Sequence, residues 1–182
     1  PIDETVYEGW FQSYKYFHDI EDQIRQEFIF RQPLLEHSIA LLHQINNTES
    51  VCLNVRRTDF IKTENLNTTD IDYFMKGARY MASRLNEPHF YIFTDDIEWC
   101  RNNLELKYPT TLVDHQHKGY KYGNYLRLLS SCKHFIIPNS SFAWWGAWLC
   151  ENSDKIVVAP QRWFNDTSID TSDLIPSEWI RL

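Results

Sequence analysis

Two adjacent arginines follow an apolar stretch of the sequence, and their charge needs an explanation. In NVRRTDF, residues 54–60, Arg56 and Arg57 come directly after VCL, which is typical of a buried strand. Guanidinium groups are rarely buried without an anionic partner, and they bind phosphate oxygens in a bidentate manner. The pair therefore favours a diphosphate site, with an ordinary ion pair to Asp59 as the simpler alternative.

A second polar group, NSSF at residues 139–142, stands at the start of an apolar helical stretch. Asn139, Ser140 and Ser141 are residue types that commonly cap helices. A helix start also presents free N–H groups and the positive end of the helix dipole, both of which favour phosphate. The sequence therefore predicts a helix start that faces the same ligand as the arginines, with Phe142 near enough to touch it.

The acidic pair in FTDD, Asp95 and Asp96, allows three interpretations. The pair could cap the helix that follows it, or its carboxylates could accept hydrogen bonds from ribose and base. A metal site is the third alternative, but adjacent carboxylates at a strand end point to different sides, which disfavours a shared metal. We predict no metal site.

The elements that position these residues alternate regularly from Pro33 onward. Five apolar strand candidates, each followed by a helical or irregular segment, are VCLNVR, HFYIFTDD, TTLVD, HFIIP and KIVVAP. This alternation predicts an α/β fold, with a Rossmann-like parallel sheet and helices on both faces. In such sheets ligands bind beyond the carboxyl ends of the strands, which is where the arginines, FTDD and NSS fall.

The chain divides, on this interpretation, into two parts. Residues 1–33 form a helical or irregular lead-in segment, and residues 34–182 form a Rossmann-like domain that carries the predicted diphosphate site. The tail from residue 161 is expected to be irregular or partly helical. The four cysteines lie without close pairing, so we expect reduced thiols and no disulfide framework.

Bulk composition limits the range of partners. The formal net charge of −7 argues against a general binder of nucleic acid or of anionic membranes, so an anion site must be a local basic spot. No apolar run approaches the roughly 20 residues that span a bilayer. No signal peptide is visible, and because the chain begins without Met, we expect that it is a fragment.

Four segments together resemble a known family. NVRRTDF, YIFTDD, LLSSCKHFIIPNSSFAWWGAWL and KIVVAPQRWF, in this order, resemble the bacterial-type α-1,2-fucosyltransferases of glycosyltransferase family 11. The resemblance covers essentially the whole chain. It implies the C-terminal, donor-binding half of a GT-B-type glycosyltransferase. The glycine-rich segment of the type GGLGNQ, which the family carries near its N-terminus, is absent, so we expect that much of the acceptor half is missing.

The resemblance also implies an activity. It is the inverting transfer of L-fucose from GDP-fucose to a hydroxyl of a glycan acceptor, without a metal or other cofactor. Two alternatives stay open, namely a non-catalytic domain that binds a nucleotide-sugar or a glycan, and a transferase that uses another GDP-sugar. No nucleic-acid partner is expected. The expected location is the cytoplasm, with peripheral membrane association of the full-length protein as a further alternative.

Roles for single residues follow from the same resemblance. Arg57 would hold the β-phosphate and Arg56 would support it or the fucose. Ser140 and Ser141 would donate hydrogen bonds to the diphosphate, and Asp95 or Asp96 would support the nucleotide region. Asn139 and Phe142 complete this part of the expected donor site.

The remaining candidates concern recognition of the guanine base and removal of the proton from the acceptor hydroxyl. The family motif HxRRxD has Asn54 at its histidine position, which leaves a polar contact to the base. A helix position that is usually acidic in the family carries Asn124, where guanine would be recognised. Asp59 is the first candidate for the general base. Glu64 is the second, because RRTDFIKTE also resembles the α-1,6-fucosyltransferases.

Overall fold

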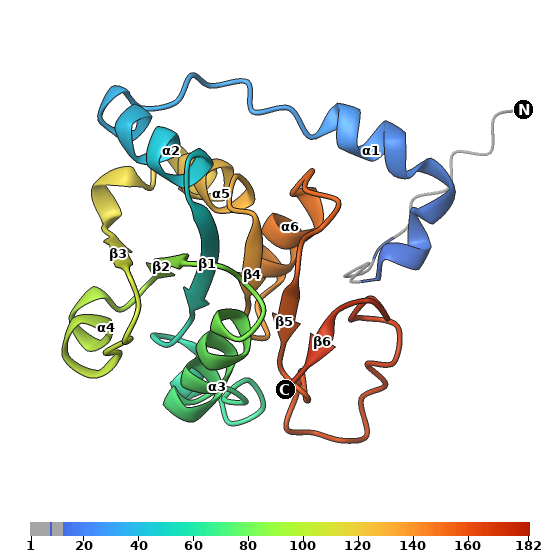
Figure 1. Ribbon diagram of the computed structural model, residues 1–182. Helices are drawn as coiled ribbons and strands as arrows, with labels where there is room; N and C mark the ends of the chain where they lie inside the picture. Colours follow the sequence, from blue (N-terminus) through green and yellow to red (C-terminus); the bar gives the residue numbers. More distant parts are fainter. Residues whose placement is uncertain (1–7, 9–12) are drawn as a thin grey trace, which may run out of the picture.

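A six-stranded parallel sheet forms the centre of the structure, a computed structural model that describes residue 8 and residues 13–182 (Figure 1). The strand order is β3-β2-β1-β4-β5-β6, and each neighbouring pair is parallel. The strands are β1 Glu49–Val55, β2 Pro88–Thr94, β3 Thr110–Val113, β4 His134–Ile136, β5 Val157–Ala159 and β6 Ile180–Arg181. The predicted α/β fold class, with a Rossmann-like sheet, is confirmed.

Helices cover both faces of this sheet, as the apolar strands require. α2 (Ile39–Asn46), α5 (Gly123–Ser130) and α6 (Ser141–Leu149) share one apolar core, whereas α3 (Ile71–Ala82) and α4 (Ile97–Asn103) share the other. In β1, Cys52 belongs to the first core and its neighbours Val51 and Leu53 to the second, as the two-residue period of a strand dictates. Figure 1 shows α2 and α5 on one side of the sheet and α3 and α4 on the other. In the part of the chain that the structure describes, no helix is long and apolar enough to cross a membrane.

The packing of α6 explains its small residues. Trp144 and Trp148 are buried in the core. A Cβ atom on Gly146 would come within 2.1 Å of Leu129 Cδ2, so glycine allows α6 to lie directly against α5. This close packing places the starts of the two helices at the same edge of the sheet.

The lead-in segment packs on the outer side of α6. Its helix α1 (Glu21–Glu27) lies in the stretch DIEDQIRQEF, where the sequence predicts a helix. The Phe17 and Phe28 rings stack on Trp145, with centroids 5.4 and 5.2 Å away. The first part of the predicted lead-in, residues 1–7 and 9–12, lies outside the described residues. The boundary at residue 33 stays a prediction.

The C-terminal tail contains a strand that the sequence does not predict. The tail is expected to be irregular or partly helical, yet β6 pairs with β5 through Val158↔Ile180 and Ala159↔Arg181. A strand of two residues is too short for any periodicity to mark it. Trp163 and Trp179 in the tail are buried in the core that contains α6. The tail is therefore part of the packed domain.

All four cysteines are free and buried, in agreement with the sequence. Burial raises the pKa of the Cys52 thiol and raises the pKa of Cys100 to about 11. Burial likewise raises the pKa of Cys150. A thiol with a raised pKa is protonated at neutral pH and is a poor nucleophile. The cysteines therefore serve the core as small apolar side chains.

Candidate functional site

A cavity of about 1150 Å³ opens at the carboxyl edge of the sheet. Its walls come from the segments that follow β1, β2, β4 and β5, together with the starts of α5 and α6. The predicted site residues that line it are Asn54, Arg56, Asp95, Asn139, Ser140, Ser141 and Phe142. The predicted residues outside its lining are Arg57, Asp59, Glu64, Asp96 and Asn124. The volume suits a ligand of the size of a nucleotide-sugar.

Arg56 carries a guanidinium group into the lining of this cavity. Its Nη2 donates to Asp59 Oδ2 at 2.9 Å, and its Nη1 lies 3.2 Å from Asp95 Oδ2. A guanidinium group has five N–H donors, and these two contacts leave others for a ligand. The two carboxylates thus fix the orientation of Arg56 without occupying all of its donors.

Asp95 holds the loop that follows β1. Its Oδ1 accepts a hydrogen bond from the Arg57 backbone N–H at 2.9 Å. Its Oδ2 accepts from the Thr58 N–H at 3.1 Å and from the Thr58 hydroxyl at 2.5 Å. Together with the ion pair to Arg56, these contacts occupy both carboxylate oxygens. Asp95 therefore positions the arginine loop.

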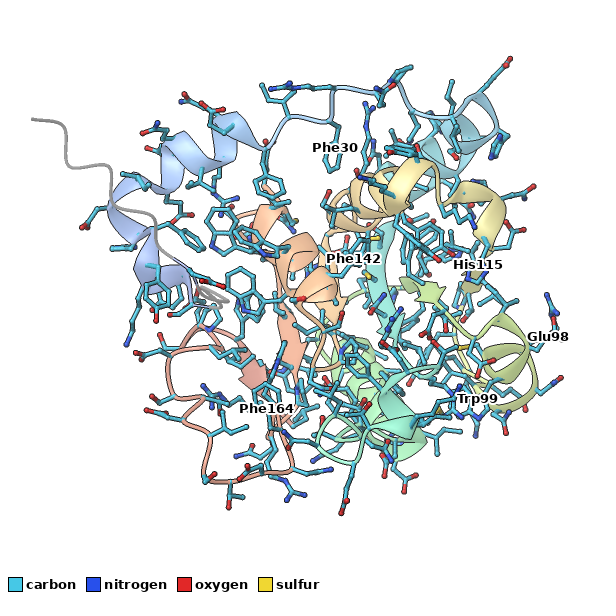
Figure 2. All side chains as sticks on the ribbon, turned by 180° about the vertical axis from the view of Figure 1, so that it is seen from behind. Phe30, Glu98, Trp99, His115, Phe142 and Phe164 are labelled. Carbon is cyan, nitrogen blue, oxygen red and sulfur yellow. The ribbon has the colours of Figure 1, made fainter. Side chains whose placement is uncertain are left out.

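Arg57 lies on another side of the same loop. Its guanidinium carbon is 3.7 Å from the centroid of the Trp99 ring, and its Nε is 3.4 Å from Asp96 Oδ2. Asp96 in turn caps α4, because its Oδ1 accepts from the Trp99 N–H at 3.1 Å. Figure 2 shows Trp99 on α4, well away from Phe142 near the start of α6. The cap interpretation of Asp96 is thus the one that the geometry supports.

The start of α6 presents free donors to the cavity. Ser140 is the N-cap residue, and no side chain makes a capping hydrogen bond there. The first helical hydrogen bond runs from Trp144 N–H to the Ser140 carbonyl at 2.9 Å. The N–H groups of the first turn consequently lack helical acceptors, as at every helix start. Since Ser140, Ser141 and Phe142 line the cavity, this helix start faces it.

Asn139 joins two loops beneath the helix start. Its Nδ2 donates to the Leu66 carbonyl at 2.9 Å and to the Trp163 carbonyl at 2.8 Å. Its Oδ1 is buried and has no hydrogen-bond partner among the described residues. Asn54, also buried, donates from Nδ2 to the Phe93 carbonyl at 3.2 Å and so links β1 to β2. Both amides therefore support the floor of the cavity as well as lining it.

The two predicted general bases lie outside the lining. Burial acts to raise the pKa of Asp59, but hydrogen bonds from Arg56 and the backbone outweigh it and hold the pKa below its usual value. Asp59 is therefore ionised at neutral pH beside Arg56. Glu64 is exposed, and its carbonyl accepts a hydrogen bond from Asn165 Nδ2 at 2.5 Å.

Both polar atoms of the Asn124 amide make hydrogen bonds within the protein. Its Nδ2 donates to the His117 carbonyl at 2.7 Å and to the Ser38 hydroxyl at 3.0 Å. Its Oδ1 accepts from the Leu35 N–H at 3.2 Å. The side chain thus ties the start of α5 to the segment before α2. The resemblance predicted guanine recognition at this position, and the geometry places it outside the cavity lining.

Sequence reasoning missed several parts of the cavity wall, among them Ser13 and Tyr16 of the lead-in segment. Two further parts come from later in the chain. One is the pair Lys121 and Tyr122, which precede α5. The flanking glycines of GYKYG could have marked this loop as a special backbone segment. The other is the tail from residue 163 to 174, which no local pattern connects with the cavity. Among the residues that the structure describes, no three His, Cys, Asp or Glu side chains gather into a metal site.

Comparison with known proteins finds relatives whose names state an activity. An alpha-1,2-colitosyltransferase of Escherichia coli is 31% identical, with 96% of this chain aligned to 61% of that protein. The O-antigen biosynthesis glycosyltransferase WbnK of Escherichia coli is 33% identical over 75% of this chain and 45% of its own length. A galactoside alpha-(1,2)-fucosyltransferase 1 of Sus scrofa is 24% identical over 81% of this chain and 43% of its own length.

The family comparison covers more of the chain than any of these relatives. This chain spans at most 61% of the length of the relatives named above. The sequence pattern of the family described as glycosyl transferase family 11 matches residues 1–182. The match includes the arginine loop and the NSSF helix start that meet at the cavity. The chain therefore belongs to glycosyl transferase family 11.

Proposed function

We propose that this chain binds GDP-fucose in the 1150 Å³ cavity and that the whole protein transfers L-fucose to a glycan hydroxyl in α-1,2 linkage. The observation that carries the proposal is the meeting of Arg56 with the uncapped start of α6 in one cavity lining. A permanent cation and free backbone donors are the groups that a diphosphate needs. Family membership and the name of the fucosyltransferase relative support the sugar and the linkage.

The reaction begins at the bond between fucose and the β-phosphate. As this bond breaks, its electron pair leaves with GDP, and the sugar acquires oxocarbenium character. Arg56 and the N–H groups at the start of α6 stabilise the charge that grows on the β-phosphate. Preorganised donors of this kind can supply about 3 kcal/mol each in favourable cases. Because these groups carry the charge, we propose a reaction that needs no metal or other cofactor.

The acceptor hydroxyl attacks the sugar from the face opposite the departing GDP, which inverts the configuration. Its proton passes to a carboxylate that acts as general base. We keep Asp59 as the first candidate for this role, because it is ionised and adjoins Arg56. Glu64, on the exposed part of the same loop, is the second candidate. Arg57 supports Arg56 indirectly, by fixing the loop against Trp99 and Asp96.

A second candidate is the transfer of colitose in place of fucose. The observation that favours it is the 31% identical relative, which carries the name alpha-1,2-colitosyltransferase. Both candidates use the same diphosphate site and differ only in the sugar that it accommodates. The non-catalytic alternative predicts nucleotide-sugar binding without turnover. A cytoplasmic location and a peripheral membrane association of the full-length protein stay predictions.

The test is a calorimetric titration with GDP, GDP-fucose, GDP-mannose, ADP and UDP, in buffer with EDTA. We expect GDP and GDP-fucose to bind without added metal, and ADP and UDP to bind at least about tenfold more weakly, or about 1.4 kcal/mol. Equal affinity for all five compounds would show that the cavity does not recognise guanine. Binding that returns only after Mg²⁺ or Mn²⁺ is added would contradict the metal-independent mechanism. Transfer of fucose by the full-length protein separates the enzyme from the non-catalytic alternative.

A further inference from the structure

The loop before α5 carries two consecutive residues with left-handed backbone angles. Lys121 has φ 47° and ψ 34°, and Tyr122 has φ 62° and ψ 13°. Residues with side chains rarely adopt this conformation, because the Cβ atom approaches the following carbonyl oxygen. In the described part of the chain the third such residue is Glu87, in the turn before β2. Strained backbone of this kind concentrates where a protein contacts its ligand, and both Lys121 and Tyr122 line the cavity.

The surrounding structure fixes this loop in its strained form. Gly119 has φ 64°, and a Cβ atom there would lie 2.6 Å from Asn124 Cβ. Asn124 holds the His117 carbonyl through Nδ2, and the Tyr125 N–H donates to the Lys118 carbonyl at 3.3 Å. Contacts on both sides thus hold the two left-handed residues in place. Contact with a ligand is one physical reason for strained backbone to persist at a cavity wall.

Lys121 contributes a second positive charge to the cavity lining. The other cation in the lining, Arg56, is paired with Asp59 and Asp95. Lys121 forms no ion pair with any described residue, and its Nζ lies 5.4 Å from the centroid of the Tyr120 ring. In a chain with a net charge of −7, an unpaired cation in the cavity wall is suited to an anionic ligand.

Tyr122 contributes a ring that stays partly uncovered. The side chain is 47% exposed although it lines the cavity. Its ring meets Tyr125 at an interplanar angle of 74°, with centroids 6.2 Å apart. An exposed aromatic face on a cavity wall can stack against a nucleobase. Tyr120, two residues earlier in the same loop, is 80% exposed and does not line the cavity.

We propose that Lys121 and Tyr122 form a second wall of the nucleotide site. The Lys121 ammonium group contacts the diphosphate, and the Tyr122 ring packs on the guanine base. The left-handed backbone aims both side chains into the cavity, which explains why the chain keeps the strain. This inference rests on the proposed function, because it assumes a guanine nucleotide in the cavity.

Glycine substitutions separate a binding role from a structural one. Lys121→Gly and Tyr122→Gly remove the strain together with the side chains, because glycine adopts left-handed angles freely. We expect both variants to keep or raise the Tm and to bind GDP at least about tenfold more weakly, in line with the loss of one charged or stacking contact. Lys121→Met keeps the length of the side chain and removes only its charge, and it should lose a similar factor.

The control removes a lysine outside the cavity lining. Lys62→Met takes away an exposed ammonium group from the loop that follows β1. It should bind GDP within about twofold of the unaltered protein, which is less than 0.5 kcal/mol. If the unaltered protein binds GDP and Lys121→Met and Tyr122→Gly bind it equally well, the inference is wrong while the proposed function stands. If the unaltered protein binds no guanine nucleotide, the proposed function fails and the inference fails with it.

Discussion

Arg56 and Arg57 are adjacent in the sequence, yet their guanidinium groups serve different surroundings. Arg56 lines the cavity, whereas Arg57 stacks on Trp99 and pairs with Asp96. The sequence predicts an arginine pair at a strand end because residue type and position are both visible in it. The sequence does not show which of the two arginines lines the cavity. Neighbouring side chains at a strand end point to opposite sides, and the contacts that fix these two come from residues about 40 positions away.

The first prediction compares these two arginines. Arg56→Met should weaken GDP binding by about tenfold or more, because hydrogen bonds to charged groups contribute about 1.5–3 kcal/mol each. Arg57→Met should change GDP affinity by less than about threefold and lower the Tm instead, since it loses its contacts with Trp99 and Asp96. Calorimetry and thermal unfolding of both variants measure this. If Arg57→Met lost more GDP affinity than Arg56→Met, Arg57 and not Arg56 would be the residue that binds the phosphate.

The second prediction concerns Asn124, the position at which the family resemblance implies an acidic residue that recognises guanine. Asn124→Asp removes both Nδ2 donors and places a carboxylate against the His117 carbonyl, which the Asn124 amide now contacts at 2.7 Å. Unsatisfied buried groups cost about 1–3 kcal/mol, so the Tm should fall and GDP binding should weaken as the loop before α5 loosens. An aspartate variant with unchanged Tm and tighter GDP binding would show that residue 124 does read the base.

At the scale of elements, the strands and helices are predictable and the loops between them are not. The apolar runs and the helical periodicity predict five strands and their connecting helices, and the sheet order then brings NVRR and NSSF to one edge. The loop after β1 meets the tail after β5 through Asn139 and Asn165, which are more than 70 residues away from the loop. Such contacts leave no local pattern. The same is true of β6, which is a strand only because β5 lies beside it.

The third prediction tests the junction of these two loops. Asn165 Nδ2 donates to the carbonyls of Glu64 and Asn67, at 2.5 and 3.2 Å. Asn165→Ala should cost about 1–2 kcal/mol of stability, the value of about two hydrogen bonds, and should speed amide hydrogen exchange in residues 63–68. Asn103→Ala is the matched control, because the Asn103 amide bonds only the Trp99 carbonyl in its own helix. Equal exchange rates in the two variants would show that Asn165 does not hold the loops together.

At the scale of the whole molecule, charge and shape together locate the site. The net charge of −7 argues against a general binder of anions, so a cation that lines a hollow is more informative than one on the open surface. Two hollows among the described residues have such cations in their lining. One is the cavity with Arg56 and Lys121, and the other is a smaller groove of about 320 Å³ lined in part by Lys76, Arg79 and Arg162. The sequence alone does not show which of these two hollows binds the nucleotide, because the residues that line each of them come from distant positions in the chain.

On the proposed function, the nucleotide diphosphate lies between Arg56 and the start of α6. A crystal structure of the protein with bound GDP would show its position. We expect a β-phosphate within hydrogen-bond distance of the Arg56 guanidinium group and of backbone N–H groups in the first turn of α6, that is, about 2.7–3.2 Å. A GDP molecule in the groove of Lys76, Arg79 and Arg162, or one whose phosphates lie away from both Arg56 and α6, would contradict it.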